Sequence, residues 1–305
     1  MEEIFDVIII GSGPAGLTAG IYASRANLKT LLLAGEKWGG QLMLTTLVEN
    51  YPGFTDGVQG PDLMTNMRKQ AERFGVKMVD ENANAVEFST SPFRVNNYQG
   101  RAVIVATGAA FNWLNLPNEQ KLIGRGVSSC ATCDAAFFKG KRVVVVGGGD
   151  AAMEEALVLS RHATAVIIVH RRGEFRASKY MQDRVKAEEK ISVVWNSSVV
   201  DVVGENKVES VKIKDNNTEE EKTIEAEGMF VAIGHSPATK LFEGKLDLDE
   251  KAYLRRQGQK YRTMSNIEGV FVSGDVHDYT YRQAVTAAGY GCEAALDAER
   301  WLAEK

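Results

Sequence analysis

The chain has 305 residues, of which 44% are hydrophobic and 25% charged, with 36 Lys and Arg against 40 Asp and Glu. This length predicts about two domains with cores of ordinary size, and the composition excludes disordered, collagen-like and low-complexity proteins. The net charge of -4 argues against a nucleic-acid-binding protein, because such a protein needs a basic surface to replace the counterions of the phosphates.

The N-terminal residues and the cysteine count favour a cytoplasmic protein. No apolar run approaches the roughly 20 residues of a membrane span, and the acidic start Met1-Glu2-Glu3 leads directly into an apolar strand. We therefore expect no membrane segment and no signal or transit peptide. Three cysteines cannot form the disulfide framework of a secreted protein, which favours a reducing compartment.

One pattern of strand, glycine-rich turn, helix and strand occurs twice along the chain. The first copy consists of the apolar run 4–10, the turn Gly11-Ser-Gly13-Pro-Ala-Gly16, a predicted helix over 17–26 and a strand over 30–33. The second copy consists of the run 142–146, the turn Gly147-Gly-Gly149-Asp-Ala-Ala152, a predicted helix over 153–161 and a strand over 166–169. Continuous apolar strands indicate parallel sheets buried on both faces. The repeat predicts an α/β fold with two Rossmann-like, three-layer ββα dinucleotide-binding domains.

The order of the remaining strands predicts that the second domain is inserted into the first. Strands that end at Thr107-Gly108 and at Gly274-Asp275 flank everything that contains the second glycine-rich turn. The predicted domains are 1–112 together with 243–305, and 113–242, joined by hinges at 112–117 and 236–246. A helix over 283–302 follows the Gly-Asp strand end, and its N-terminal N–H groups are expected to face a ligand.

The residues after the second strand of each copy indicate which cofactor that copy binds. The run His170-Arg171-Arg172-Gly-Glu-Phe-Arg176 has no acid for a ribose 2′-hydroxyl but several cations for a 2′-phosphate, which favours NADPH over NADH. The alternative is a solvated basic turn. In the first copy Glu36 lies slightly late for a ribose contact, and Gly39-Gly40-Gln41 permits close approach of a second large ligand. FAD suits this copy, because the nearby N-terminus of the last helix would stabilise negative charge on a reduced flavin.

The segment Cys130-Ala-Thr-Cys133-Asp134 is the candidate redox centre. A zinc site needs four ligands, and Cys292 and the four His form no second half-site, so we expect no metal. A redox dithiol needs thiolates that attack disulfides and a nearby group that moves protons, for which Asp134 is placed. Two unrelated buried thiols remain the alternative, and Cys292 is expected to be a small core residue.

These motifs, in this order, resemble the low-molecular-weight thioredoxin reductases of bacteria and archaea. The resemblance spans nearly the whole chain and rests on the two glycine turns and on Gly39-Gly-Gln41, Val48-Glu-Asn50-Tyr-Pro-Gly53-Phe, Ala106-Thr-Gly108, Cys130-Ala-Thr-Cys133-Asp134, His170-Arg-Arg172, Phe175-Arg-Ala-Ser178 and Gly274-Asp275 through Tyr281-Arg-Gln-Ala284. It implies a homodimer with one FAD per chain that uses NADPH to reduce thioredoxin. It also implies that the inserted domain rotates, since the disulfide and the nicotinamide must reach the same flavin in turn.

The resemblance also implies roles for individual residues. Cys133 would face the flavin, Cys130 would exchange with thioredoxin, and Asp134 would donate and accept protons. The implied FAD contacts are Ser12, Gly13, Pro14, Ala15, Ala34, Gly35, Glu36, Lys37, Trp38, Gly39, Gly40, Gln41, Asn50, Asp275, Arg282, Gln283, Ala284 and Val285. The implied NADPH contacts are His170, Arg176, Ile233 and Tyr253, with Arg171 and Arg172 nearby. Arg171, Arg172, Ala83 and Asp150 complete the predicted cofactor-binding residues.

Two positions depart from the family pattern, which usually has Gly where Ala135 stands and Ser where Ala151 stands. The apolar patch expected to receive thioredoxin reads Ala136-Phe137-Phe138, with Arg125 as a further contact, although core packing explains the two Phe equally well. Three alternatives therefore stay open: a reductase of another thioredoxin-like or glutaredoxin-like protein, a ferredoxin-dependent enzyme of the same fold, and a non-catalytic flavin- or NADP-binding regulator.

Overall fold

The computed structural model describes residues 3–305 and divides the chain into two compact units. Unit 1 contains the chain up to Ala110 and again from Ser236 to Lys305, and unit 2 contains Phe111–His235. The domain boundary that the sequence predicts after residue 242 lies after His235 in the structure. Residues 236–242 belong to unit 1, because Phe242 is fully buried in one of the cores of that unit.

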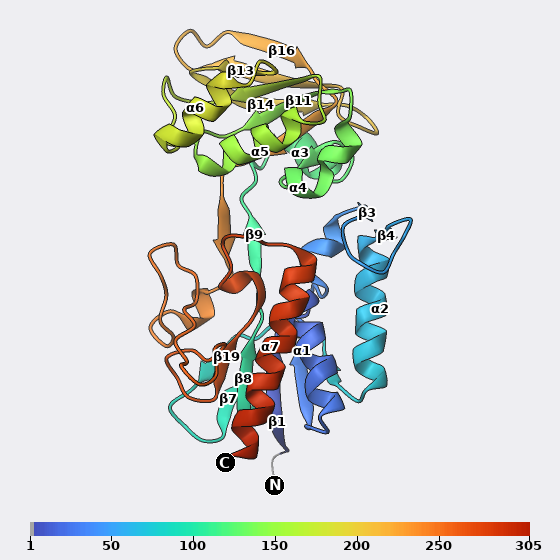
Figure 1. Cartoon of the computed structure of the whole chain (residues 1–305), viewed down its shortest axis with the longest axis vertical. Coiled ribbons are helices and arrows are strands. Elements are labelled where there is room, and N and C mark those ends of the chain that lie inside the picture. The colour runs from blue at the N-terminus through green and yellow to red at the C-terminus, as the bar shows by residue number, and fades with distance from the viewer. Residues whose placement is uncertain (1–2) are drawn as a thin grey trace. The chain divides into compact units, whose positions relative to one another are not determined.

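Unit 1 is built on a largely parallel sheet (Figure 1) with the strand order β5-β2-β1-β8-β7-β6. The strand β19 pairs in parallel with residues 103–105 of β8, beyond the part of β8 that pairs with β7. Its strands are β1 (Ile4–Ile10), β2 (Thr30–Leu33), β5 (Lys77–Val79), β6 (Val86–Glu87), β7 (Phe93–Val95), β8 (Tyr98–Val105) and β19 (Val270–Val272), with a separate hairpin of β3 (Leu47–Val48) and β4 (Val58–Gln59). Its helices are α1 (Pro14–Arg25), α2 (Gly60–Arg73) and α7 (Ala284–Ala303), and its 3₁₀ helices are η1 (Gly40–Leu44), η3 (Lys240–Phe242) and η4 (Gly274–Val276).

Both faces of this sheet are buried, as the continuous apolar strands predict. Val7 and Ile9 of β1 belong to the core under the helices, whereas Ile8 and Ile10 belong to the core on the opposite face. Helices α1 and α7 lie side by side (Figure 1). A Cβ at Gly291 of α7 would lie 2.1 Å from the Ala15 carbonyl oxygen, so the absence of a side chain there permits this close approach.

Unit 2 contains the second parallel sheet, with the order β10-β17-β11-β12-β13. Its strands are β10 (Val127–Ser128), β11 (Arg142–Val146), β12 (Ala165–Val169), β13 (Ile191–Val194) and β17 (Gly228–Val231), and an antiparallel sheet contains β14 (Ser197–Val203), β15 (Ser210–Asp215) and β16 (Glu221–Glu225). The helices are α3 (Pro117–Leu122), α4 (Ala131–Asp134), α5 (Asp150–Ser160) and α6 (Lys179–Ala187), with the 3₁₀ helix η2 (Ala135–Phe138). The predicted α/β class with two Rossmann-like units is confirmed.

Two short strands, β9 (Ala109–Phe111) and β18 (His235–Pro237), carry the chain from one unit to the other and pair with each other. On the unit 1 side, the Thr107 hydroxyl donates to the Ala238 carbonyl at 2.8 Å. On the unit 2 side, the Asn112 amide donates to the Gly234 carbonyl at 3.0 Å. Within residues 3–305, no helix combines the length and the apolar character needed to cross a membrane.

Candidate active site and cofactor sites

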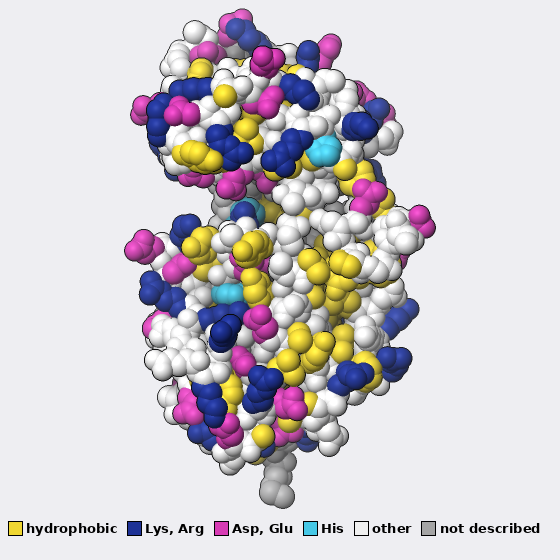
Figure 2. Space-filling model, in the orientation of Figure 1, with side chains coloured by type: hydrophobic (Ala, Val, Ile, Leu, Met, Phe, Trp, Pro, Cys, Tyr) yellow, Lys and Arg dark blue, Asp and Glu magenta, His cyan; other side chains and the backbone are white. Residues whose placement is uncertain are grey.

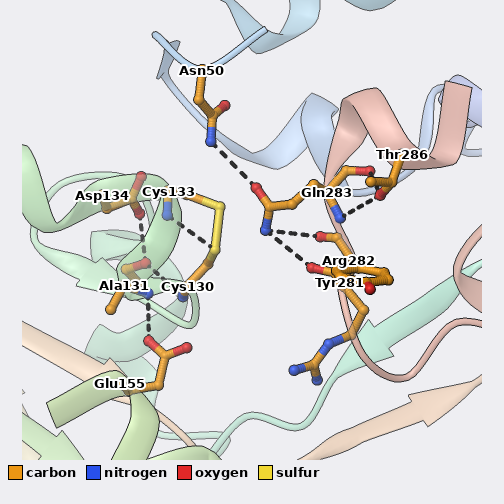
Figure 3. The surroundings of a disulfide bond; sticks show 11 residues. Asn50, Cys130, Ala131, Cys133, Asp134, Glu155, Tyr281, Arg282, Gln283 and Thr286 are labelled. Atoms are coloured by element: carbon orange, nitrogen blue, oxygen red, sulfur yellow. Dashed lines mark hydrogen bonds between the residues drawn. A yellow bond between two sulfur atoms is a disulfide. The ribbon is translucent and has the colours of Figure 1, made fainter. Parts of the chain in front are cut away.

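Cys130 and Cys133 form a disulfide at the start of α4 (Figure 3), with Cα atoms 5.3 Å apart. Cys130 is the N-cap of this one-turn helix, and its carbonyl accepts from the amides of Cys133 at 3.2 Å and Asp134 at 3.1 Å. The Cys133 amide also lies 3.2 Å from the Cys130 Sγ. Amide donors at a helix start stabilise a thiolate, so the turn suits thiol–disulfide exchange.

Asp134 ends this turn and is held by a serine that the sequence interpretation did not single out. The buried Ser128 hydroxyl donates to Asp134 Oδ2 at 2.5 Å and accepts from the Cys130 amide at 3.1 Å. Burial raises the pKa of the Asp134 carboxyl, and the hydrogen bond from Ser128 opposes this shift. A carboxyl with a raised pKa beside a disulfide can exchange protons with thiols.

A second carboxylate, Glu155 on α5, holds the other side of the turn. Its Oε2 accepts a hydrogen bond from the Ala131 amide at the start of α4 (Figure 3). Because Ala131 is almost fully buried, its amide cannot donate a hydrogen bond to water. The Glu155 carboxylate provides the acceptor instead. The sequence contains no local signal for Glu155, since the contact joins residues 24 positions apart.

The expectation that Cys292 is a core residue is wrong. Its thiol is half-buried on α7 and hydrogen-bonds the exposed Tyr22 side chain, which raises the pKa of Tyr22. The helices α1 and α7 bring these two residues to the surface together.

The first glycine turn has the geometry of a pyrophosphate-binding turn. A Cβ at Gly16 would lie 1.9 Å from the Gly11 carbonyl oxygen, whereas one at Gly13 would meet no atom within 4 Å. Gly13 is the N-cap of α1 and offers no side-chain cap, so the first amides of α1 lie next to open space. Helix amides in this state bind anions, and Pro14 and Ala15 form the first turn.

The predicted FAD-contact segment 34–41 folds against this turn. Ser12 Oγ donates to the Ala34 carbonyl at 2.6 Å and accepts from the Gly39 amide at 2.9 Å. Further contacts in this segment are Gly35 N to the Glu81 carbonyl at 3.1 Å, Glu36 N to Asn82 Oδ1 at 3.2 Å, the Arg68 guanidinium 4.7 Å from the Trp38 ring centroid, and Gly40, whose added Cβ would lie 3.4 Å from the Gly13 Cα. Lys37 is exposed, and Gln41 and Ala83 are partly buried.

The residues from Gly274 to Val285 approach the same turn from the C-terminal part of unit 1. A Cβ at Gly274 would lie 2.7 Å from the Ala15 Cβ, which places Asp275 beside the start of α1. Buried Asp278 accepts from the amides of Thr280 at 2.8 Å, Tyr281 at 2.9 Å and Arg282 at 3.2 Å. This turn leads into Gln283, the N-cap of α7, with Ala284 and Val285 in its first turn. Asn50 Nδ2 donates to Gln283 Oε1 at 3.3 Å (Figure 3).

Asp275 indicates that a polar ligand belongs at this place. Burial, and then the neighbouring Asp278, raise the pKa of Asp275 to about 7. Its Oδ1 is buried and has no hydrogen-bond partner within the described part of the chain. Since buried polar atoms nearly always have partners, a ligand with hydroxyl donors would complete the site, and FAD carries such groups. The open turn at Gly13 and the orphaned Asp275 oxygen therefore fit a flavin dinucleotide.

Unit 2 repeats the open turn. Gly147 has φ 155°, and an added Cβ would lie 2.5 Å from the Ala232 carbonyl oxygen. At Gly149, the N-cap of α5, an added Cβ would meet nothing within 4 Å. Asp150 Oδ1 accepts from the amide of Ser178 at 3.0 Å and from its hydroxyl at 2.7 Å, and these bonds lower the pKa of Asp150. The residues here fit the pyrophosphate of a second dinucleotide.

The structure separates His170 from the three arginines with which the sequence groups it. Arg171, Arg172 and Arg176 are exposed after the end of β12, where a 2′-phosphate could be bound. His170 is 4% exposed, with Nε2 2.9 Å from the Glu174 carbonyl oxygen. Burial lowers the pKa of His170. An added Cβ at Gly148 would lie 2.2 Å from the His170 ring, so the ring packs directly under the glycine turn.

The last two predicted nucleotide contacts lie in different units. Ile233 is 40% exposed just beyond β17 in unit 2. Tyr253 lies in unit 1, where it is buried and its ring centroid is 5.6 Å from that of Tyr279. Burial raises the pKa of Tyr253, the charge of Arg282 opposes this shift, and the charge of Asp275 adds to it. Tyr253 therefore neighbours the candidate FAD site.

Two dinucleotide-type turns and a disulfide beside a carboxyl define a disulfide oxidoreductase. The family model described as "Pyridine nucleotide-disulphide oxidoreductase" matches residues 5–291. A thioredoxin reductase of Streptomyces clavuligerus is 53% identical, with 99% of this chain and 95% of that protein covered. A bifunctional thioredoxin reductase/thioredoxin of Mycobacterium leprae is 50% identical, with 99% of this chain and 67% of that protein covered. The solved thioredoxin reductase from Giardia duodenalis has a TM-score of 0.94 and 42% identity, with 99% of this chain and 100% of that chain covered.

The chain therefore belongs to the pyridine nucleotide-disulphide oxidoreductase family, and within it to the thioredoxin reductases.

Proposed function

We propose that this protein uses NADPH and FAD to reduce thioredoxin through the Cys130–Cys133 disulfide. The observation that carries the proposal is the disulfide at the start of α4, with the Asp134 carboxyl connected to it through Ser128. A dithiol formed here would have both amide donors for a thiolate and a carboxyl that accepts its proton.

The cofactors are bound by the two open turns. The turn at Gly13, the segment 34–41 and Asp275 would hold FAD in unit 1, and the turn at Gly149 and the arginines after β12 would hold NADPH in unit 2. Bound NADPH and FAD would together supply the electron pair that reduces the disulfide. The exposed Arg171, Arg172 and Arg176 support NADPH, because guanidinium groups bind a phosphate in a bidentate manner.

Thiol–disulfide exchange then follows from the residues of the turn. Once reduced, Cys130 transfers its proton to Asp134, and its thiolate attacks the disulfide of thioredoxin, forming a mixed disulfide and releasing one thiolate that takes the proton from Asp134. Cys133 then transfers its proton to Asp134, and its thiolate attacks the Cys130 sulfur. The Cys130–Cys133 disulfide forms again, and the second thioredoxin sulfur leaves as a thiolate that takes the proton from Asp134.

Thioredoxin as the substrate is supported by the relative whose name joins thioredoxin reductase and thioredoxin in one polypeptide. Ala136 and Arg125 are exposed and Phe137 is half-buried, so these three can form part of a docking surface. Phe138 belongs to the core, since its ring packs 5.1 Å from that of Phe230. An Ala at position 135 fits this core, where it is 4% exposed.

A cytoplasmic homodimer is part of the same proposal. Figure 2 shows apolar side chains gathered over the face of unit 1 that carries α1 and α7. Tyr22 of α1 is 42% exposed, which supports a partner surface. Sedimentation analysis of the purified protein, with Tyr22→Glu as the disrupting variant, tests for the dimer.

The central experiment measures oxidation of NADPH and of NADH with a panel of thioredoxins and glutaredoxins. We expect flavin absorbance in the purified protein, a preference for NADPH, and reduction of at least one thioredoxin. Cys130→Ser and Cys133→Ser should each abolish reduction of the protein substrate while FAD stays bound. Full reductase activity in either serine variant would overturn the proposal, and activity only with a glutaredoxin would replace the substrate.

A further inference from the structure

Ser128 connects three parts of the redox site with a single hydroxyl. It ends β10, which pairs in parallel with β17, so its backbone is fixed by the sheet of unit 2. Its hydroxyl accepts from the Cys130 amide at 3.1 Å and lies 2.5 Å from Asp134 Oδ2. The side chain is 7% exposed, so water does not compete for these bonds.

The direction of these two bonds determines what the hydroxyl offers to Asp134. A backbone amide can only donate, so the Cys130 N–H occupies an acceptor position of the Ser128 oxygen. The hydroxyl hydrogen is then free to point at the carboxylate. A hydrogen bond donated to a carboxylate stabilises the ionised form, whereas burial of Asp134 favours the neutral form.

The charged groups on the elements packed against α4 do not replace this donor. In the described chain, neither α5 nor η2 carries a Lys or Arg. The acids of α5 are otherwise placed: Asp150 binds Ser178, Glu154 is exposed, and Glu155 accepts from the Ala131 amide. The neutral hydroxyl of Ser128 is therefore the group that opposes the cost of burying a charged Asp134.

We propose that Ser128 is a positioning residue that holds the Asp134 carboxyl beside the redox turn and keeps it available as a base for the Cys130 thiol. This inference rests on the proposed function, in which Asp134 takes the proton of Cys130 before the thiolate attacks a substrate disulfide. No atoms or electrons are added to that exchange: the proton moves from Cys130 to Asp134 and then to the departing thiolate. Ser128 changes only the pH range in which Asp134 is ionised and able to accept.

The test follows the exchange step alone. The holoprotein is reduced with one equivalent of NADPH and mixed with a small aromatic disulfide, 5,5′-dithiobis(2-nitrobenzoate), and the rate of thiolate release is measured between pH 5 and pH 9. The rate should fall in acid as Asp134 becomes protonated, which gives the pH profile an acidic limb. In Ser128→Ala, the carboxylate loses one hydrogen-bond donor, so the midpoint of this limb should move to a pH about one unit higher. Ser128→Thr keeps the hydroxyl and should restore the profile, and Ser129→Ala is the matched control that should leave it unchanged.

Asp134→Asn separates failure of the inference from failure of the proposed function. If Asp134→Asn removes the acidic limb while the pH profile of Ser128→Ala is the same as that of the wild type, Asp134 is the base and the inference about Ser128 is wrong. If Asp134→Asn retains the limb, the proposed role of Asp134 is wrong. Ser128→Gly, which also removes the hydroxyl, replaces Ser128→Ala if that variant does not fold.

Discussion

Among single residues, the buried titratable groups of unit 1 have the largest pKa shifts. His277 Nδ1 donates to the Gly274 carbonyl oxygen at 2.5 Å, and its ring packs edge-on with its centroid 4.7 Å from that of Tyr290. Burial, and then the charge of Arg256, lower the pKa of His277 to about 4. The folded protein therefore keeps His277 neutral at pH values at which the unfolded chain would protonate it.

This shift predicts loss of stability in acid. Since the folded pKa lies below the usual value, stability is fully present above about pH 6.5 and falls as the pH decreases toward 4. Between pH 7 and pH 5 the wild type should lose about 2 kcal/mol more than His277→Gln, as measured by chemical denaturation. The exposed His162→Gln is the matched control, and an equal pH dependence in wild type and His277→Gln would contradict the prediction.

A second residue-scale prediction concerns cofactor selection. Arg176 is exposed, and its amide donates to the Gly148 carbonyl at 2.8 Å, which fixes its backbone at the glycine turn. Arg176→Ala should raise the KM for NADPH about 10-fold or more, because charge-assisted bonds to a phosphate are lost, and should leave the KM for NADH nearly unchanged. Arg161→Ala, at the other end of α5, is the control. Equal losses for both cofactors would mean that Arg176 does not contact the 2′-phosphate.

At the scale of elements, α4 is too short to be stable without external partners. It has one turn, and its first amide depends on Glu155 of α5. Glu155→Ala should destabilise the protein by about 1–3 kcal/mol, since a buried amide loses its acceptor. Glu155→Gln retains an acceptor oxygen and should recover most of this loss.

Hydrogen exchange at the Ala131 amide measures this effect directly. Protection should be lost in Glu155→Ala, kept in Glu155→Gln, and unchanged in Glu154→Ala, which alters the exposed neighbour. Retained protection in Glu155→Ala would show that another group satisfies this amide.

The elements themselves were predictable to different degrees. The central strands were found because parallel strands buried on both faces are continuous apolar runs, and β2 (Thr30–Leu33) coincides with its predicted range. The helices after the glycine turns begin three residues earlier than predicted, at Pro14 and Asp150. The reason is that Gly13 and Gly149 are the N-caps, so each helix starts inside the motif.

At the scale of the whole molecule, the proposed reaction requires that the two units move. Both chain crossings run through the paired strands β9 and β18. Deletion of Asn112 or of Ser236 should lower NADPH-driven reduction of thioredoxin about 100-fold or more while FAD stays bound, because small misplacements of reacting groups are costly. Turnover and the flavin content per chain are measured together.

Deletion of Asn217, in the turn between β15 and β16, is the control for this experiment. This turn joins two strands of unit 2 and belongs to neither crossing, so turnover should be preserved. Normal turnover in either crossing variant would argue against a required rotation.

The sequence by itself determined the fold class, the two nucleotide turns and the redox cysteines, because each depends on residues that are close together in the chain. An apolar run, a glycine spacing and a Cys-x-x-Cys pair retain their meaning without knowledge of the rest of the fold. Only the tertiary structure revealed Ser128 and Glu155 as partners of the redox turn, and it alone separated His170 from the exposed arginines. Hydrogen bonding and burial depend on which distant elements pack together, and a sequence pattern contains no direct record of that packing.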